Sequence, residues 1–268
     1  SAYVFRTSDG GATYVEVAKL TAADAAAYDE FGRSVAIDGD TIVIGAYGAG
    51  AGGAVYVFRT SNGGATYDEV AKLTASDAAT ADRFGHSVAV DGNTIVVGAD
   101  KDNSNRGSVY VFRTSGGWTT HTEFKLTASD AAANDHFGRS VAINGNAIVA
   151  GASQYWRGDA IVSGHAYIFG TNDDGATYIQ VAKASCQSGC SDLDQFGESV
   201  GISNDRVVIG GQGADNGNHG AAYVLRTTDG DQVAKLKGSP AQANDWCGTS
   251  VAIDGNRIVF GCPGEDDG

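Results

Sequence analysis

The sequence predicts an all-β protein, a five-bladed β-propeller of four-stranded blades, in a single domain that spans residues 1–268. Three observations support this prediction: the composition, five copies of one sequence block, and a spacing of the copies that stays in phase across the two chain ends. Glycine occurs 39 times and proline only 2 times, and the apolar residues are mostly Val, Ile, Ala, Tyr and Phe. Such a composition suits short pleated strands joined by tight turns.

The repeated block is 18 residues long, and self-similarity at a regular period indicates a repeat architecture. The copies are DEFGRSVAIDGDTIVIGA from Asp29, DRFGHSVAVDGNTIVVGA from Asp82, DHFGRSVAINGNAIVAGA from Asp135, DQFGESVGISNDRVVIGG from Asp194 and DWCGTSVAIDGNRIVFGC from Asp245. Successive FG positions are 53, 53, 59 and 51 residues apart, and the interval counted across the chain ends is 52. We therefore expect a closed ring in which N-terminal strands pair with C-terminal strands in one shared blade.

Each repeat contains four strand-like runs, as a propeller blade requires. In the second repeat they lie at 86–90, 94–98, 108–113 and 122–127. The first two runs are separated by a dipeptide such as Asp91-Gly92, which is typical of a type I′ hairpin turn. A lysine recurs on the fourth run, where a charge on an exposed strand edge discourages pairing with another molecule. These residues are Lys19, Lys72, Lys125, Lys183 and Lys235.

The four cysteines are predicted to form two disulfides. With the turn centred on the Asp-Gly dipeptide, Phe84 faces Ala99, and in the fifth copy Cys247 faces Cys262. A disulfide there would replace a large and small packing pair, with two buried thiols as the alternative, and Cys186 and Cys190 are expected to form a local bridge. An even cysteine count in an acidic, glycine-rich β protein favours an oxidising compartment. The sequence therefore predicts a secreted protein or one displayed at the cell surface.

Charge and hydropathy exclude two classes of partner. The formal net charge is −14, from 32 acidic and 18 basic residues, so the overall field repels polyanions and nucleic-acid binding is not expected. No run of apolar residues approaches the length that a membrane-spanning helix needs, so membrane insertion is not expected either.

The pattern D-x-FG-x-SVAI-DG-x-x-IV-x-GA, followed by G-x-x-YVFR, resembles the FG-GAP repeat of integrin α-chain propellers and their relatives over essentially the whole chain. The resemblance implies a propeller in which the FG phenylalanine packs between blades and the inner strand begins at the SVA run. Integrin-type repeats often hold calcium in an acidic loop between the first two strands, whereas this chain has only a two-residue turn there. Integrin propellers also have seven blades, whereas the repeat spacing in this chain predicts a ring that closes with five.

Residues that occur in every copy are interpreted as architectural, because a binding site is normally asymmetric while every blade needs the same turns. An aspartate and a serine in each block are expected to cap loops through hydrogen bonds, and a glycine near its end is expected at a close-packing position. The aspartates are Asp29, Asp82, Asp135, Asp194 and Asp245; the serines are Ser34, Ser87, Ser140, Ser199 and Ser250; the glycines are Gly45, Gly98, Gly151, Gly210 and Gly261.

Function is expected where the copies differ, on the face built from the loops before the first strand and between the second and third strands. The residue after each FG is predicted to ring the mouth of the central channel: Arg33, His86, Arg139, Glu198 and Thr249. Acid–base hydrolysis of a glycoside needs a pair of carboxylates, and this ring offers only Glu198. The chain also lacks an HExxH motif. An enzyme is therefore not predicted.

The longest variable loop, residues 153–166, accounts for the 59-residue interval between copies. Aromatic faces beside hydrogen-bonding groups are what a sugar ring or a protein hot spot requires, with an ordinary decorated loop as the alternative reading. The candidate ligand-binding residues in this loop are Tyr155, Trp156, Arg157 and Asp159.

A second variable loop, GADKDNSNRGS, carries oxygen donors that would suit calcium, with a solvated acidic turn as the alternative. The candidate metal ligands are Asp100, Asp102, Asn103 and Asn105.

Together these features predict an extracellular binding or adhesion module that recognises a glycan or an extracellular protein through its variable loops. No cofactor is predicted apart from this possible calcium. A purely structural propeller in an extracellular assembly is the alternative, and a glycoside hydrolase comes third.

Overall fold

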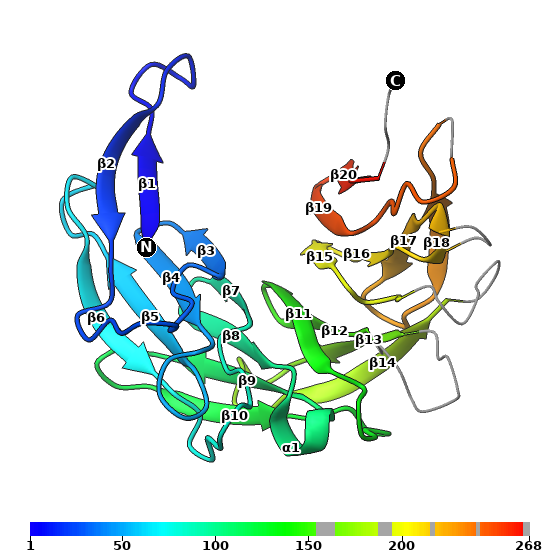
Figure 1. Cartoon of the computed structure of the whole chain (residues 1–268), viewed down its shortest axis with the longest axis horizontal. Coiled ribbons are helices and arrows are strands. Elements are labelled where there is room, and N and C mark those ends of the chain that lie inside the picture. Colours follow the sequence, from blue (N-terminus) through cyan, green and yellow to red (C-terminus); the bar gives the residue numbers. More distant parts are fainter. Residues whose placement is uncertain (154–163, 187–194, 215–217, 240–241, 265–268) are drawn as a thin grey trace.

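The computed structural model describes residues 1–153, 164–186, 195–214, 218–239 and 242–264. Twenty strands and one helical turn, α1 (Asp102–Asn105), make up its regular structure. The strands form antiparallel sheets arranged in an arc around a common centre (Figure 1). The all-β propeller arrangement that the sequence predicts is confirmed.

Four sheets are complete four-stranded blades, each with its strands in chain order from the inside of the arc to the outside. They comprise β3 (Ser34–Asp38), β4 (Thr41–Ala46), β5 (Ala54–Arg59) and β6 (Asp68–Leu73); β7 (Ser87–Asp91), β8 (Thr94–Ala99), β9 (Ser108–Arg113) and β10 (Thr122–Leu126); β11 (Phe137–Asn144), β12 (Ala147–Ala152), β13 (His165–Gly170) and β14 (Ile179–Ser185); and β15 (Val200–Ser203), β16 (Arg206–Gly211), β17 (Ala221–Arg226) and β18 (Gln232–Leu236).

The fifth repeat is divided between the two ends of the arc. β1 (Ala2–Arg6) pairs with β2 (Val15–Leu20), and β19 (Ser250–Asp254) pairs with β20 (Arg257–Gly261), in two separate two-stranded sheets. Figure 1 shows these half-blades facing each other across an open gap. The predicted pairing of N-terminal with C-terminal strands is therefore not present in this structure.

The repeat spacing shows that the two chain ends together supply the strands of one blade. It could not establish that the ring closes, because closure depends on the angle between neighbouring blades, which side-chain packing sets. The open ends leave apolar side chains uncovered. Val35 on β3 is 60% exposed, whereas Val88, at the same repeat position on β7, is 9% exposed because β3 packs against β7. An apolar groove of about 400 Å³ runs beside Val35 and is lined also by Tyr3, Phe5 and Ile37.

The hairpin turns lie one residue later than the sequence pattern suggested. Asp38 pairs with Thr41, so the turn residues are Gly39 and Asp40 rather than Asp38 and Gly39. Only Gly39 has a positive φ, of 53°, which is the pattern of a type II′ turn with glycine first. The same offset occurs at the equivalent turns in the other blades.

A bulge restores the predicted facing pairs in spite of this offset. In β11, the register shifts between Phe137 and Ser140, and Phe137 then lies opposite Ala152 as predicted. In the fifth copy, the disulfide between Cys247 and Cys262 is present, which confirms the predicted bridge. Cys186 is also disulfide-bonded; its predicted partner Cys190 lies outside the described residues.

Neighbouring blades are joined by the residues that recur in every copy. Phe84 is fully buried between the first and second of these blades, where it shares one core cluster with Val55 of the first and packs against Tyr110 of the second. The Ser87 hydroxyl donates a hydrogen bond to the Gly138 carbonyl of the next blade, and Gly98 lies so close to that carbonyl that a Cβ atom would overlap it. The recurring serines therefore bind the next blade rather than their own loop.

The recurring aspartates cap their own loops, as predicted. Asp82 accepts a hydrogen bond of 2.6 Å from the Ala79 backbone nitrogen, and equivalent bonds are made by Asp29, Asp135 and Asp245. Asp194 lies outside the described residues.

The recurring lysines are partnered, which corrects their interpretation as simple guards of a strand edge. Lys125 lies over the ring of Tyr110 and forms an ion pair of 2.5 Å with Asp77, whose other carboxylate oxygen accepts a hydrogen bond from the Tyr110 hydroxyl. Among the described residues, the same trio recurs as Tyr56, Asp24 and Lys72, and as Tyr167, Asp130 and Lys183. Each trio fixes the crossover loop from one blade onto the outer strands of the next.

Candidate functional site

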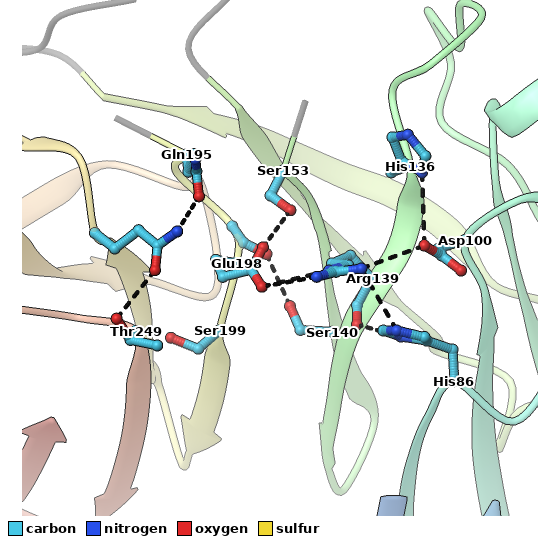
Figure 2. A network of polar contacts seen from close by, with 12 residues as sticks. His86, Asp100, His136, Arg139, Ser140, Ser153, Gln195, Glu198, Ser199 and Thr249 are labelled. Carbon is cyan, nitrogen blue, oxygen red and sulfur yellow. Dashed lines mark hydrogen bonds and ion pairs between the residues drawn. The ribbon is translucent and has the colours of Figure 1, made fainter. Parts of the chain in front are cut away.

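Three of the side chains predicted to ring the channel mouth meet at one place, on three successive blades (Figure 2). His86 precedes β7, Arg139 lies on β11, and Glu198 precedes β15. All three occupy the position after FG, which faces the inside of the arc because the inner strand begins there. The repeat geometry therefore brings residues from one variable position of successive repeats together in a cluster.

Arg139 is the centre of this cluster. Its Nη2 atom lies 3.1 Å from Oε1 of Glu198, and Nε donates to the same oxygen at 3.4 Å. The Ser153 hydroxyl donates to the other oxygen of Glu198 at 2.7 Å. Burial opposes the charge on Arg139, but the ion pairs with Glu198 and Asp100 outweigh it and raise the pKa of the guanidinium group.

His86 is held as a neutral imidazole. Its Nδ1 atom lies 3.3 Å from the Arg139 backbone carbonyl, which can only accept, so Nδ1 carries the proton. Nε2 then accepts from Nη1 of Arg139 at 3.5 Å. Burial lowers the pKa of His86, which favours the neutral imidazole.

A fully buried carboxylate lies beneath the cluster. Asp100 directly follows β8, and its side chain is 0% exposed. His136 Nδ1, Arg139 Nη1 and Arg83 Nη1 lie 3.5, 3.6 and 3.9 Å from its Oδ2 atom, and neither carboxylate oxygen accepts a hydrogen bond of good geometry. Burial alone would raise the pKa of Asp100, but His136 and the surrounding positive charges lower it. Asp100 is therefore an ionised counter-ion for three cationic or basic side chains.

A pocket of about 340 Å³ opens above this carboxylate. Its lining residues are Arg83, Asp100, His136, Arg139 and Ser153. At its edge, the Arg83 guanidinium group lies 5.4 Å from the centre of the Tyr47 ring, which in turn packs 5.8 Å from the His86 ring. The pocket therefore combines hydrogen-bond donors, a hydroxyl group and an aromatic neighbour.

The structure does not bring all of the predicted site residues together. Arg33 occupies the same repeat position as Arg139, but it is exposed and makes no side-chain contact with the cluster. Thr249, at the fifth position, hydrogen-bonds to Gln212, which also contacts Gln195 in a separate polar group (Figure 2). The predicted ligand-binding residues of the insertion, Tyr155, Trp156, Arg157 and Asp159, lie outside the described residues.

Sequence reasoning missed two of the residues that line the pocket, although a signal for them was present. Arg83 and His136 occupy the position before the FG phenylalanine, which also differs between the copies. Both have positive φ, 62° and 55°, and their side chains reach Asp100. Glu30, Gln195 and Trp246 are the equivalent residues in the other copies.

The predicted calcium ligands do not converge on one point. Asp100 is surrounded by cationic side chains, whereas Asp102 accepts hydrogen bonds from the Ser108 hydroxyl and from Lys125. The Asn105 side chain donates to Asn134. Within the described residues, no group of three or more His, Cys, Asp or Glu side chains is arranged to hold a metal ion. The carboxylates of this loop therefore have protein partners already.

Comparison with protein families matches the FG-GAP repeat at five successive positions, residues 14–58, 67–112, 120–169, 180–225 and 231–268. The chain therefore belongs to the FG-GAP repeat family. A search of the curated proteins finds no match.

Among solved structures, the chain is similar to Sqt1 of Saccharomyces cerevisiae, with 9% sequence identity and a TM-score of 0.48. That match covers 79% of this chain and 48% of Sqt1. In the part of the chain that the structure describes, no helix is long and apolar enough to cross a membrane.

Proposed function

We propose that this propeller is an extracellular binding module, secreted or displayed at the cell surface, that recognises a glycan at the pocket above Asp100. The observation that carries the proposal is the convergence of variable residues from successive blades on one partly open pocket. Residues that differ between repeats have no role in the architecture common to all blades. The variable side chains at the pocket are nevertheless held in place by ion pairs with the buried carboxylate of Asp100, and a binding site requires such fixed side chains.

Binding fits this pocket better than hydrolysis does. Glu198 is neutralised by Arg139 and accepts from Ser153, and Asp100 is sealed from solvent. A glycosidase needs one accessible carboxylate to protonate the leaving oxygen and a second to attack or activate water. Neither carboxylate is free for these tasks, so we propose that the protein is not an enzyme.

A structural role in an extracellular assembly is the second candidate function, and a different observation favours it. In the described structure, β1 and β20 each have one edge without a partner strand. An exposed strand edge with apolar neighbours is a surface on which another strand can pair.

A glycan array tests the binding proposal. We expect the fluorescently labelled wild-type chain to bind a subset of saccharides, and the Arg83→Ala variant to lose that signal. Glu30→Ala is a matched control, because Glu30 has the same repeat position and a similar positive φ of 58° but lies outside the pocket. Absence of any saccharide signal with the wild-type chain would contradict the proposal, and equal losses in both variants would place the site elsewhere.

A further inference from the structure

We propose that the ligand recognised at this pocket is an acidic glycan, held through the carboxylate of a uronic acid unit; this inference rests on the proposed glycan-binding function. The argument concerns what the pocket presents to a ligand. Asp100 itself is out of reach, with a side chain that is 0% exposed. The side chains of Arg83, Arg139 and His136, above it, are 32%, 25% and 17% exposed.

Asp100 therefore acts on the ligand only through the groups that it holds. Its ion pairs are 3.5 to 3.9 Å long, which is beyond good hydrogen-bonding geometry, so they orient the three basic side chains without using their N–H groups. The accessible rim of the pocket consists mainly of hydrogen-bond donors, among them the guanidinium groups of Arg83 and Arg139. A ligand that matches such a rim carries acceptor oxygens with negative charge.

Arg83 has the greatest spare capacity for such a ligand. Its guanidinium group contacts the Tyr47 ring and Asp100, but it makes no hydrogen bond to any of the described residues. Arginine presents five N–H donors in a planar fork whose spacing matches the two oxygens of a carboxylate. The cation–π contact with Tyr47 restricts the positions open to this fork, which reduces the entropy lost on binding.

Three features favour a sugar carboxylate over an acidic peptide. The pocket volume of about 340 Å³ is near the lower limit for ligand pockets, so it suits one ring-sized unit better than an extended chain. Glu198 lies beside Arg139 with a side chain that is 17% exposed, so it offers a carboxylate to the hydroxyl groups of a sugar ring. An acidic peptide would also bring several charges towards a chain whose net charge is −14, whereas a single uronic acid brings one.

Isothermal titration calorimetry with two matched probes tests this inference. The probes are a galactose trimer in which one unit is replaced by galacturonic acid and its carboxyl-reduced counterpart, a trimer of galactose, each titrated into the full chain. We expect the acidic trimer to bind at least about tenfold more tightly than the neutral one, because a charge-assisted bidentate contact is available only to the first. Arg83→Ala should remove about tenfold of affinity for the acidic trimer and leave the neutral trimer unchanged, and Arg83→Lys should recover part of the loss.

The outcomes separate this inference from the proposed function. If the neutral trimer binds as tightly as the acidic one and loses affinity in Arg83→Ala, the glycan site stands and the uronic acid is wrong. If neither trimer binds but a glutamate-rich peptide does, both glycan proposals fail. Glu30→Ala again controls for backbone strain, and circular dichroism confirms that each variant is folded.

Discussion

The Ser87 hydroxyl lies 2.8 Å from the carbonyl oxygen of Gly138, to which it donates a hydrogen bond from one blade to the next. The same contact joins Ser34 to Gly85, Ser140 to Gly197 and Ser199 to Gly248. The fifth serine, Ser250, is exposed and makes no such bond to any described residue. This repeated contact makes the interface between blades directly testable.

We predict that Ser87→Ala lowers the free energy of unfolding by about 1 kcal/mol, because the Gly138 carbonyl loses its donor. Chemical denaturation in guanidinium chloride measures this. Ser250→Ala is the matched control and should change stability by less than about 0.5 kcal/mol. A loss at Ser250 equal to that at Ser87 would contradict the open arc, because it would mean that Ser250 meets the equivalent carbonyl of Gly32 in solution.

Gly98→Ala should destabilise the protein by about 3 kcal/mol, since the added methyl group would overlap the backbone carbonyl of Gly138 and push neighbouring blades apart. Gly116→Ala provides the control, because no atom lies within 4 Å of the Cβ position there and the backbone is unstrained. Thermal unfolding followed by circular dichroism compares the two variants. Similar melting temperatures would show that the blades can separate without cost.

The Cys247–Cys262 disulfide spans 15 residues, and replacement of both cysteines by serine should cost about 3 kcal/mol of stability. A second variant, Cys247→Phe with Cys262→Ala, recreates the pair found in the other repeats, such as Phe84 and Ala99. In a complete blade that phenylalanine packs on third-strand aromatics, as Phe84 does on Tyr110. We expect the second variant to recover only part of the loss, because the β19–β20 half-blade has no third strand; full recovery would indicate that β1 supplies one.

The free energy of unfolding should fall as the pH drops below about 6.5, the ordinary pKa of histidine. Burial lowers the pKa of both His86 and His165 in the folded chain. Between the unfolded and folded pKa values, the unfolded chain therefore binds protons that the folded chain does not, so acid favours unfolding. Denaturation at pH 7.5 and pH 5.5 should show a smaller difference for His86→Gln than for the wild-type chain. His121→Gln is the control, because His121 is exposed, and it should keep the wild-type difference between the two pH values. If His86→Gln also kept the wild-type difference, the conclusion that burial lowers the pKa of His86 would be wrong.

Much of the fold could be predicted from the sequence because each repeat contains the turn, capping and close-packing residues that its own strands and loops need. The recurring aspartate caps its loop through Ala79 in the second copy, and the recurring glycine permits the close approach of Gly138, both as predicted. The turn was placed one residue too early because Asp-Gly is a strong hairpin signal, and Gly-Asp in the same sequence gives a different turn type. Only the strand register could distinguish them.

The candidate site was predicted in part. The variable position after FG correctly brought together His86, Arg139 and Glu198, because equivalent residues of successive blades face the same channel. Arg33 has the same signal but is exposed and lies apart from the cluster, because the residues of the neighbouring blade decide what each of these positions contacts. Asp100 was assigned to a possible metal site because acidic loops suit calcium, whereas its actual partners, Arg83, His136 and Arg139, come from elsewhere in the sequence.

The sequence by itself determined the strands, their order within each blade, the number of repeats and the covalent link between Cys247 and Cys262, because these depend on local periodicity and on residues close together along the chain. The tertiary structure alone decided the angle between blades, the open arc and the charged pocket around Asp100. These features arise where side chains from different repeats pack and form ion pairs across sequence separations of up to 59 residues, and such contacts are set by the whole geometry of the chain.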